Sequence, residues 1–503
     1  MKNSFPTALI ILDGFGYKEE EEGNAIAQAS MPTFSKLLST YPATTLKASG
    51  ASVGLPDGYN GNSEVGHLTL GCGTVVPQSL TLVEKAIEDG SFYKNQKLKA
   101  AFVTLKDSGK TLHLMGLLSD GGVHSSLDHL FAFLKMAAKE GVENIVIHGF
   151  LDGRDTIPHS AENYLALVEK QCKTLGIGII GSLHGRFYAM DRNKNWQQTE
   201  KSYLALTSSQ ENKTQTWQEY LKEQNNAHPS EEFFDPVQLN SQATIKTGDG
   251  VIFFNIRADR ARQLTSFFLD GNTLKNEDPL KLAFFITPVS YGPDHNTITL
   301  FERPETPQTL TQFLHDQDYS IFTIAETEKY AHITYFFNGG REEKLTNETR
   351  VLVPSITREK YDKFPEMSAP TITQATLESL KTNPQDLYII NYANADMVGH
   401  TGDFNATLKA LECLDTQLKE LINEIVVKQK GIVYITSDHG NAEEMIDGKT
   451  KQPLTSHTQN PVFFIMVTEE LKDIHLVLPL HQLSDVAPFI AQVMLDGLQT
   501  SLR

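Results

Sequence analysis

The sequence predicts an α/β protein built from two α/β domains. Ten short apolar stretches have the length and composition of buried strands. Amphipathic stretches with helical spacing lie between them, for example at 127–134 and 406–427. This alternation of strands and helices is typical of the α/β class. A chain of 503 residues exceeds what one ordinary hydrophobic core serves, which predicts two large domains.

The first predicted strand covers 8–12, where the run TALIIL leads into Asp13-Gly14. The others are predicted at 112–117, 144–148, 178–183, 251–255, 283–286, 321–324, 387–391, 432–436 and 462–467. Ser484-Asp485 is typical of a helix start and predicts a last helix. Nearly every cluster of polar residues follows directly after a predicted strand. Open α/β sheets bind ligands at the carboxyl ends of their strands, so this placement favours a functional role.

Composition narrows the classes of partner. The net charge of −18 and the absence of a basic run argue against nucleic-acid binding. Cys72, Cys172 and Cys413 are widely spaced and form no CxxC pattern, which excludes a disulfide framework and a thiolate metal site. The run TALIIL is too short for a signal peptide, and no stretch reaches membrane-span length. We therefore expect a cytoplasmic protein without a membrane partner.

Three distant segments are rich in metal-binding side chains. With the loop after the first strand they supply three carboxylates and three imidazoles: Asp13, Asp396, His400, Asp438, His439 and His457. This number is enough for two metal ions. Divalent metals with mixed nitrogen and oxygen ligands activate water or serine and bind phosphoryl oxygens. The pattern predicts a hydrolase or a phosphoryl-transfer enzyme.

Each of these motifs also has an ordinary structural interpretation. Asp396 and His400 alone fit an exposed loop aspartate with a capping histidine, and His457 alone fits a polar loop. Asp438-His439 is a stronger signal, because adjacent ligands can serve two neighbouring metals. The combination favours the metal site, and all of these residues are expected to follow strands.

Two further residues gain a functional interpretation from the metal motifs. Ser63 lies in GYNGNSEVGH, a turn expected to lead into a helix. A helix-capping serine is the commoner role there, whereas beside metals Ser63 would be a nucleophile. Lys329 in ETEKYAH is either a solvated lysine or a cation that stabilises the serine alkoxide or a transferring phosphoryl group.

Arginine is concentrated in the middle of the chain. No arginine precedes Arg154, yet six lie between Arg154 and Arg262. Such a cluster predicts recognition of carboxylate or phosphate, with a run of surface salt bridges as the alternative. The candidate residues on loops after strands are His124, Arg154, Asp155, Arg186, Arg192, Arg257 and Arg260. Asp155 is also a candidate general acid–base group whose pKa neighbouring arginines would set.

Shared metals would decide the domain organisation. If Asp13 and Ser63 join residues beyond Asp396 in one site, the two chain ends form one domain and the middle is an insertion. Pro77 and the pair Pro304 and Pro307 are plausible crossing points. The expected domains are 1–77 with 308–503, which would bind metal, and 78–307, which would carry the arginines.

Eight runs that span nearly the whole chain resemble one family, the cofactor-independent phosphoglycerate mutases of the alkaline-phosphatase-like superfamily. The runs are LDGFG, GNSEVGH, LLSDGGVHS, DGRDT, YAMDR, ETEKY, NADMVGHTG and SDHGNAE. The resemblance implies a phosphatase-like domain with an inserted phosphotransferase domain. It also implies an isomerase of glycolysis and gluconeogenesis that interconverts 3-phosphoglycerate and 2-phosphoglycerate without 2,3-bisphosphoglycerate.

The resemblance further implies two Mn²⁺ ions and a phosphoserine at Ser63. One metal would be held by Asp13, Ser63, Asp438 and His439, and the other by Asp396, His400 and His457. The substrate would be bound, or its transfer assisted, by His124, Arg154, Asp155, Arg186, Arg192, Arg257, Arg260 and Lys329. Ser126 and Asn193 depart from the family pattern at positions that bear on substrate fit. We expect a monomer acting on this small-molecule substrate.

Two other functions remain open at this stage. A metal-dependent phosphatase or phosphodiesterase would share the two-metal domain but would not need an inserted arginine cluster. A non-catalytic phosphometabolite-binding protein would be expected to lack a ligand or the nucleophile, and none is missing. The nitrogen and oxygen ligands also admit zinc, cobalt or iron in place of manganese.

Overall fold

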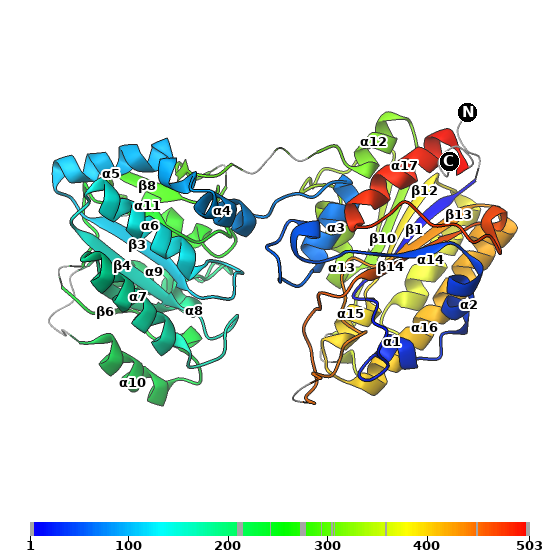
Figure 1. The fold of residues 1–503 in the computed structure, drawn as a ribbon, viewed down its shortest axis with the longest axis horizontal. Helices are drawn as coiled ribbons and strands as arrows, with labels where there is room; N and C mark the ends of the chain where they lie inside the picture. Colours follow the sequence, from blue (N-terminus) through cyan, green and yellow to red (C-terminus); the bar gives the residue numbers. More distant parts are fainter. Residues whose placement is uncertain are drawn as a thin grey trace. The chain divides into compact units, whose positions relative to one another are not determined.

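A computed structural model describes residues 5–208, 215–241, 243–271, 278–292, 294–302, 305, 307–357, 360–448 and 451–498. The chain divides into two compact units, shown in Figure 1. The first unit contains Met1–Pro77 and Pro304–Arg503, and the second contains Gln78–Arg303. Each unit has a seven-stranded sheet with helices on its faces, which confirms the predicted α/β class. No helix within the described ranges is both long and apolar enough to span a bilayer.

The sheet of the first unit has the strand order β11-β10-β12-β1-β13-β14-β2. Its first five strands run parallel, and β14 and then β2 are antiparallel to their neighbours. The strands are β1 (Thr7–Leu12), β2 (Ala43–Leu46), β10 (Ile321–Glu326), β11 (Glu348–Val353), β12 (Leu387–Tyr392), β13 (Ile432–Thr436) and β14 (Val462–Val467). The central strand β1 is buried along its whole length, as expected for a strand covered on both faces.

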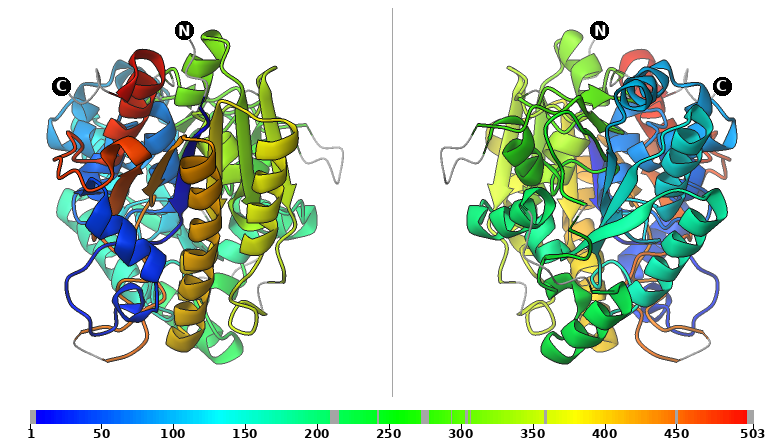
Figure 2. Two further views of the ribbon diagram at one scale, coloured as in Figure 1. Left: turned by 90° about the vertical axis from the view of Figure 1, so that its right-hand side faces the viewer. Right: turned by 90° about the vertical axis from the view of Figure 1, so that its left-hand side faces the viewer.

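Helices cover both faces of this sheet (Figure 2). One layer contains α1 (Ala25–Gln28), α2 (Pro32–Thr40), α14 (Ala369–Thr382) and α16 (Phe404–Ile422), the last drawn in gold in the left panel. The other contains α3 (Ser63–Cys72), α12 (Leu310–Asp316) and α17 (Val486–Asp496). Ala8, Ile10 and Leu12 of β1 pack in the first layer's core, and Leu9 and Ile11 in the second's. Successive side chains of a strand point to opposite faces of the sheet, so the apolar residues of β1 are divided between the two cores.

The sheet of the second unit has the order β6-β5-β4-β3-β7-β8-β9, and all its pairs are parallel except β5 with β6. Its strands are β3 (Leu112–Leu118), β4 (Ile145–Leu151), β5 (Ile179–Gly185), β6 (Val237–Gln238), β7 (Gly250–Phe253), β8 (Phe284–Thr287) and β9 (Ile298–Thr299). The helices α4 (Ser79–Glu88), α5 (Gln96–Ser108) and α7 (Ala161–Leu175) each pack against α6 (Leu127–Glu140) on one face (Figure 2, right). The other face carries α8 (Arg186–Ala189), α9 (Trp196–Thr207) and α11 (Arg262–Leu269), while α10 (Trp217–Ala227) contacts α7.

All ten predicted strands are present, with ends shifted by at most a few residues. The sequence missed four strands. Most residues of β2 and β11 are partly or fully exposed and form no continuous apolar run, and β6 and β9 contain only two residues each. The helix predicted at 406–427 is α16, which continues into a π-helical turn at Asn423–Lys428. After Ser484-Asp485 the predicted last helix is α17.

Candidate active site

Four loops of the first unit deliver polar side chains to one edge of its sheet. Asp13 follows β1, and Asp438-His439 follows β13. Lys329 lies on α13 (Thr327–Ala331) after β10, and Asp396 lies on α15 (Asn394–Gly399) after β12. The strands β10, β12, β1 and β13 are consecutive and parallel, so their carboxyl ends meet at this edge.

His457 reaches the same edge by a different route. It precedes β14 instead of following a strand, so the expectation that every site residue follows a strand is wrong here. Because β14 is antiparallel to β13, β14 begins where β13 ends. His457 Nε2 consequently lies 3.1 Å from Asp396 Oδ1.

Ser63 is the first residue of α3 and is not its N-cap. Asn62 is the N-cap, and its side chain accepts the hydrogen bond from the Val65 backbone N–H. The Ser63 hydroxyl is therefore available for other contacts. Its Oγ lies 3.0 Å from His439 Nε2 and 3.3 Å from Asp13 Oδ1.

The ammonium group of Lys329 lies at the centre of these side chains. It donates to Ser63 Oγ at 2.7 Å, to Asp13 Oδ1 at 2.5 Å and to Asp396 Oδ2 at 2.6 Å. Burial alone would lower the pKa of Lys329, but the carboxylates of Asp13 and Asp396 outweigh it and raise the pKa above its usual value. Burial alone would raise the pKa of Asp13, yet Lys329 reverses this shift and lowers it. All three groups are charged.

Asp396, His400 and His457 form a trio whose hydrogen bonds fit a cation. The Nδ1 atoms of the two histidines donate to backbone carbonyls, His400 to Thr455 at 2.6 Å and His457 to Gly61 at 3.0 Å. Their Nε2 atoms lie 3.0 Å apart and face the Asp396 carboxylate, which outweighs burial and raises the pKa of His400. In neutral rings the two Nε2 lone pairs repel each other unless a proton or a metal ion lies among them. The trio is one of the candidate metal groups in the described residues.

The second candidate metal group surrounds Asp13. His439 Nδ1 contacts the Gly440 carbonyl at 3.2 Å, and its Nε2 lies 3.5 Å from Asp13 Oδ1 and 3.4 Å from Asp438 Oδ2. Asp438 Oδ2 is fully buried, and the polar atoms near it include two imidazole nitrogens, His67 Nδ1 at 3.1 Å and His439 Nε2 at 3.4 Å. A buried carboxylate needs compensating positive charge, which a metal ion would supply.

Burial alone would lower the pKa of His439. The carboxylates of Asp438, Asp13 and Asp396 outweigh burial and raise the pKa to about 9. Without a cation this imidazole is therefore protonated at neutral pH. Its proton compensates part of the negative charge of three neighbouring carboxylates, as a metal ion would.

Glu443 connects the loops that carry these ligands, and the sequence analysis assigned it no role. Its carboxylate accepts hydrogen bonds from Gly16 N at 3.1 Å, Asn441 N at 2.8 Å and Asn460 Nδ2 at 3.0 Å, and also from the Thr458 hydroxyl. The three loops concerned follow β1, follow β13 and precede β14. Glu443 lies in the quoted run SDHGNAE, but its partners are too distant in sequence to be inferred from it.

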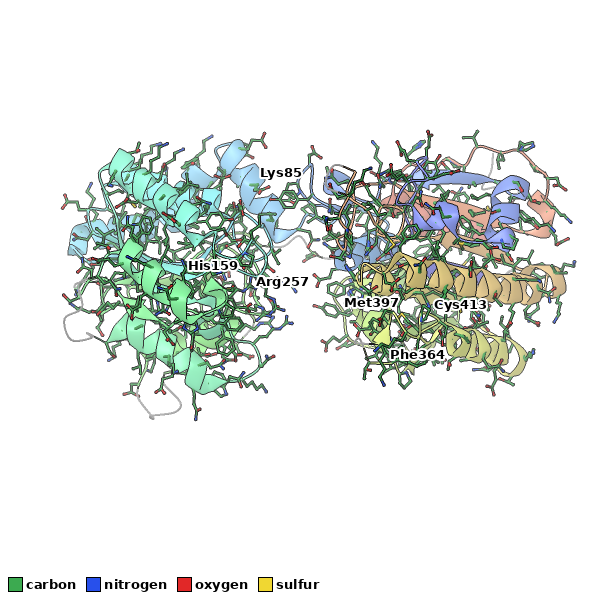
Figure 3. The ribbon with its side chains drawn as sticks, turned by 90° about the horizontal axis from the view of Figure 1, so that it is seen from below. Lys85, His159, Arg257, Phe364, Met397 and Cys413 are labelled. Carbon is green, nitrogen blue, oxygen red and sulfur yellow. The ribbon has the colours of Figure 1, made fainter. Side chains whose placement is uncertain are left out.

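The second unit gathers His124 and the predicted arginines at the carboxyl ends of β3, β4, β5 and β7, which are also adjacent and parallel. Arg186 is buried, and its Nη1 lies 2.6 Å from both Asp152 Oδ1 and Asp155 Oδ2. Arg257, labelled in Figure 3, lies on the loop between β7 and α11. Its Nε is 3.1 Å from Asp259 Oδ1.

Asp259 also binds Arg192, whose Nη1 lies 2.7 Å from Asp259 Oδ2. Arg260 Nη1 donates to the Met190 carbonyl at 3.3 Å, and Arg154 Nη1 lies 3.4 Å from Glu232 Oε1 with its side chain more than half exposed. The sequence missed Asp152 and Asp259 as partners of the arginines, although both lie inside the motifs DGRDT and NIRADR.

The guanidiniums of this arginine cluster repel one another although carboxylates lie among them. Burial lowers the pKa of Arg260, and the guanidiniums of Arg192, Arg186 and Arg154 lower it further. Such repulsion among cations is typical of a site that awaits an anion. Burial likewise lowers the pKa of His124 to about 4, with Arg186 adding to the effect, so His124 is neutral at pH 7.

The two departures from the family pattern have local structural roles. Ser126 is the N-cap of α6, and its side chain accepts from the Asp128 backbone N–H at 3.3 Å. The Asn193 backbone N–H donates to Asp191 Oδ2 at 3.2 Å. Neither residue has a side-chain contact with the arginine cluster among the interactions described.

The similarity to known proteins extends over the whole chain. Residues 83–292 match the family model for the N-terminus of the BPG-independent PGAM family. Proteins named 2,3-bisphosphoglycerate-independent phosphoglycerate mutase are 43% identical in Clostridium novyi and 44% identical in Synechococcus elongatus. Each alignment covers 97% of this chain, with 96% of the Clostridium protein and 93% of the Synechococcus protein.

A crystal structure of Leishmania mexicana phosphoglycerate mutase at low cobalt concentration matches with a TM-score of 0.75 and 30% identity. The match covers 98% of this chain and 96% of that one. With the relatives at 43–44% identity, this shared sequence and fold place the chain in a family of enzymes: it belongs to the 2,3-bisphosphoglycerate-independent phosphoglycerate mutases.

Proposed function

We propose that this enzyme interconverts 3-phosphoglycerate and 2-phosphoglycerate through a phosphoserine at Ser63. In the first step the Ser63 hydroxyl loses its proton, Ser63 Oγ forms a bond to phosphorus, and the bond from phosphorus to one glycerate oxygen breaks. The departing oxygen takes up a proton. In the second step the other glycerate hydroxyl loses a proton and attacks the phosphoserine. The bond from phosphorus to Ser63 Oγ breaks, and Ser63 Oγ takes up a proton, which restores the hydroxyl. No 2,3-bisphosphoglycerate enters this cycle.

The observation that carries the proposal is the surroundings of Ser63 Oγ. The hydroxyl is the only alcohol in contact with Lys329 Nζ among the described hydrogen bonds, and it begins a helix. A fixed ammonium and a helix N-terminus both stabilise a serine alkoxide and an incoming phosphate. Lys329 remains protonated and therefore acts as an electrostatic partner, not as the base.

The residues fit two divalent metal ions, which we propose to be Mn²⁺. Asp13, Ser63, Asp438 and His439 would hold one, and Asp396, His400 and His457 the other. Bound metals would act as Lewis acids that lower the pKa of the serine hydroxyl and neutralise phosphoryl charge. The carbonyl contacts of the three histidines fix their tautomers for this role.

The arginine cluster is the proposed binding site for the carboxylate and phosphate of the substrate. Asp259 holds Arg192 and Arg257, while Asp152 and Asp155 hold Arg186, so the guanidiniums are positioned before substrate binds. Asp155 is the proposed proton donor and acceptor for the glycerate hydroxyls, with His124, Arg154, Arg260 and Lys329 assisting binding or transfer. We further propose a monomer that acts in the cytoplasm.

Product analysis tests the proposal against the hydrolase alternative. Purified enzyme loaded with Mn²⁺ is incubated with 3-phosphoglycerate alone. Formation of 2-phosphoglycerate supports a mutase, whereas stoichiometric free phosphate would establish a phosphatase. Exhaustive chelation should abolish the reaction and Mn²⁺ should restore it. Full activity in protein shown by elemental analysis to be metal-free would refute the metal assignment.

A further inference from the structure

Asn391 connects two side chains near Ser63 that are distant in sequence. It is the fifth residue of β12 and is fully buried. Its Nδ2 donates to Asp13 Oδ2 at 2.9 Å and lies 3.0 Å from His67 Nε2. His67 lies on α3, one turn after Ser63, and is also fully buried.

The charge of Asp13 fixes the orientation of the Asn391 amide. A flipped amide would place its carbonyl oxygen against Asp13 Oδ2, where two oxygen lone pairs would repel each other. Asn391 Oδ1 instead has no hydrogen bond to any described residue. Both N–H groups therefore face Asp13 and His67, and His67 Nε2 must accept a hydrogen bond.

The contacts of the other ring nitrogen, Nδ1, independently indicate that the ring proton of His67 lies on Nδ1. His67 Nδ1 lies 2.9 Å from the Ser63 carbonyl oxygen and 3.1 Å from Asp438 Oδ2. Both of these oxygens are acceptors, so Nδ1 must carry the proton. The opposite neutral tautomer would carry its proton on Nε2, where this N–H would point at the N–H of Asn391. It would also leave a lone pair on Nδ1, facing the lone pairs of the Ser63 carbonyl and of Asp438 Oδ2.

We propose that Asn391 and His67 are a pair of positioning residues for the metal-binding carboxylates and the nucleophile. Asn391 orients Asp13, and His67 orients Asp438 and the carbonyl of Ser63 in the first turn of α3. A hydrogen-bonded partner behind a ligand typically contributes 10–100-fold to metal affinity. The inference rests on the proposed function, because that function assigns Asp13, Asp438 and Ser63 to one metal.

The tautomer of His67 can be measured directly in metal-free wild-type protein. Nitrogen NMR of protein labelled at histidine distinguishes a protonated from an unprotonated ring nitrogen, and a His67→Asn sample assigns the signals. We expect Nδ1 of His67 to carry a proton and Nε2 to accept the hydrogen bond from Asn391. A proton on Nε2 would overturn the proposal without any variant having to fold.

Substitution of Asn391 by aspartate changes one amide nitrogen to oxygen and leaves the shape intact. In Asn391→Asp, we expect Nε2 of His67 to become a hydrogen-bond donor while Nδ1 keeps its proton. We also expect Mn²⁺ to bind about 10–100-fold more weakly in one of its two binding steps. Asn394→Asp is the matched control: Asn394 is equally buried, but its Nδ2 donates to the carbonyls of Pro365 and Glu366. It should leave the His67 tautomer unchanged.

Two substitutions of His67 separate positioning from packing. Asparagine can place an N–H close to the position of Nδ1, whereas leucine fills space without a donor. His67→Asn should therefore bind Mn²⁺ at least about 10-fold more tightly than His67→Leu, measured by calorimetry against a competing chelator. Equal affinities in both variants would contradict the proposal. Wild-type protein that binds no divalent metal would instead refute the proposed metal centre and leave the tautomer measurement to decide this inference.

Discussion

Lys329 Nζ donates a 2.7 Å hydrogen bond to Ser63 Oγ and at the same time bridges the carboxylates of Asp13 and Asp396. The proposed function assigns these two carboxylates to different metals. One buried ammonium thus holds the nucleophile together with one ligand from each metal group. Electrostatic stabilisation by a fixed donor requires little reorganisation during the reaction, because the donor is already in place.

Replacement of Lys329 by methionine should separate its structural role from its catalytic role. Removing one partner from a buried ion pair costs about 3–5 kcal/mol, so metal-free Lys329→Met should unfold at lower temperature. Mn²⁺ should stabilise this variant more than wild type, because the metal replaces missing positive charge. The rate constant kcat with metal bound should fall about 100–1,000-fold.

Lys428→Met is the control for that experiment, because Lys428 has an exposed side chain that pairs with Glu424. Its unfolding free energy should change by less than about 1 kcal/mol. Calorimetric unfolding with and without Mn²⁺, beside steady-state kinetics, measures both effects. A Lys329→Met protein with wild-type kcat would contradict the assigned role.

Replacement of Ser63 by alanine should remove mutase activity by at least about 1,000-fold, the scale of losing an essential nucleophile. Metal content should remain, because Ser63 is one of several ligands. Ser368→Ala is the matched control: its buried hydroxyl donates to the Pro354 carbonyl in the same unit. That variant should lose about 1 kcal/mol of stability and keep its rate. Near wild-type turnover by metal-loaded Ser63→Ala would exclude the phosphoserine route.

The sequence predicted the ligands of this site better than their supporting residues. Asp13, Asp396 and Asp438 were predicted because each lies at or just beyond the end of an apolar run, where parallel strands present side chains. His67 and Asn391 were missed because each lies inside an apolar helix or strand pattern. A polar residue in a fully buried strand such as β12 was the available signal, since buried amides need partners. The partners themselves are 324 residues apart and could not be inferred.

The fold was predictable to a similar extent and for similar reasons. Strands covered on both faces, such as β1 and β12, are continuous apolar runs, whereas the partly exposed edge strands β2 and β11 are not. The antiparallel direction of β14, which places His457, is set by pairing with β13 and has no local sequence signal.

Metal affinity should rise with pH because of His439. Its pKa of about 9 in the metal-free protein means that binding a metal must displace a proton at neutral pH. The raised pKa also stabilises the metal-free fold below pH 6.5, and this contribution is lost as the pH rises through about 9. Calorimetric titration with Mn²⁺ in two buffers of different ionisation enthalpy measures the protons released. Affinity that stays constant from pH 7 to pH 9 would contradict this linkage.

Acid should destabilise the second unit through a buried histidine network. His113 Nδ1 lies 2.9 Å from His148 Nε2, and Ser182 Oγ contacts both His148 and His184 at 2.7 Å. Burial lowers the pKa of His184 to about 3, lowers the pKa of His148 well below its usual value, and lowers the pKa of His113. These rings stay neutral when folded but take up protons when unfolded, so stability falls as the pH drops below about 6.5.

His184→Asn tests this effect, because it removes one such ring and should flatten the fall in stability by up to about 1.4 kcal/mol per pH unit. Urea unfolding between pH 7.5 and pH 5 measures the slope. His159→Asn is the control, since His159 is exposed and adopts a positive φ of 66° that asparagine tolerates. An unchanged slope in His184→Asn would show that this ring does not contribute to acid sensitivity.

Replacement of Arg192 by lysine should make the enzyme release glycerate and phosphate. Once the phosphoryl group is on Ser63, only the carboxylate of glycerate remains as a strong anchor. A guanidinium can bind that carboxylate with two parallel hydrogen bonds, whereas an ammonium cannot. Asp259 already orients Arg192 and Arg257 through its two oxygens, at 2.7 and 3.1 Å. We expect free phosphate to increase relative to 2-phosphoglycerate, and KM to rise about 10-fold for the loss of one charge-assisted contact.

An isotope experiment measures this retention directly. A mixture of unlabelled 3-phosphoglycerate and 3-phosphoglycerate labelled in both its phosphate and its carbon is converted by the enzyme, and the products are separated by mass. Wild-type enzyme should keep each phosphoryl group on its own glycerate, because glycerate stays bound between the two steps. Arg192→Lys should produce mixed products, and Arg350→Lys, whose guanidinium pairs with Glu348 in the first unit, should not. Extensive mixing by the wild-type enzyme would show that glycerate exchanges with solution during every turnover, and would refute retention while leaving the phosphoserine intact.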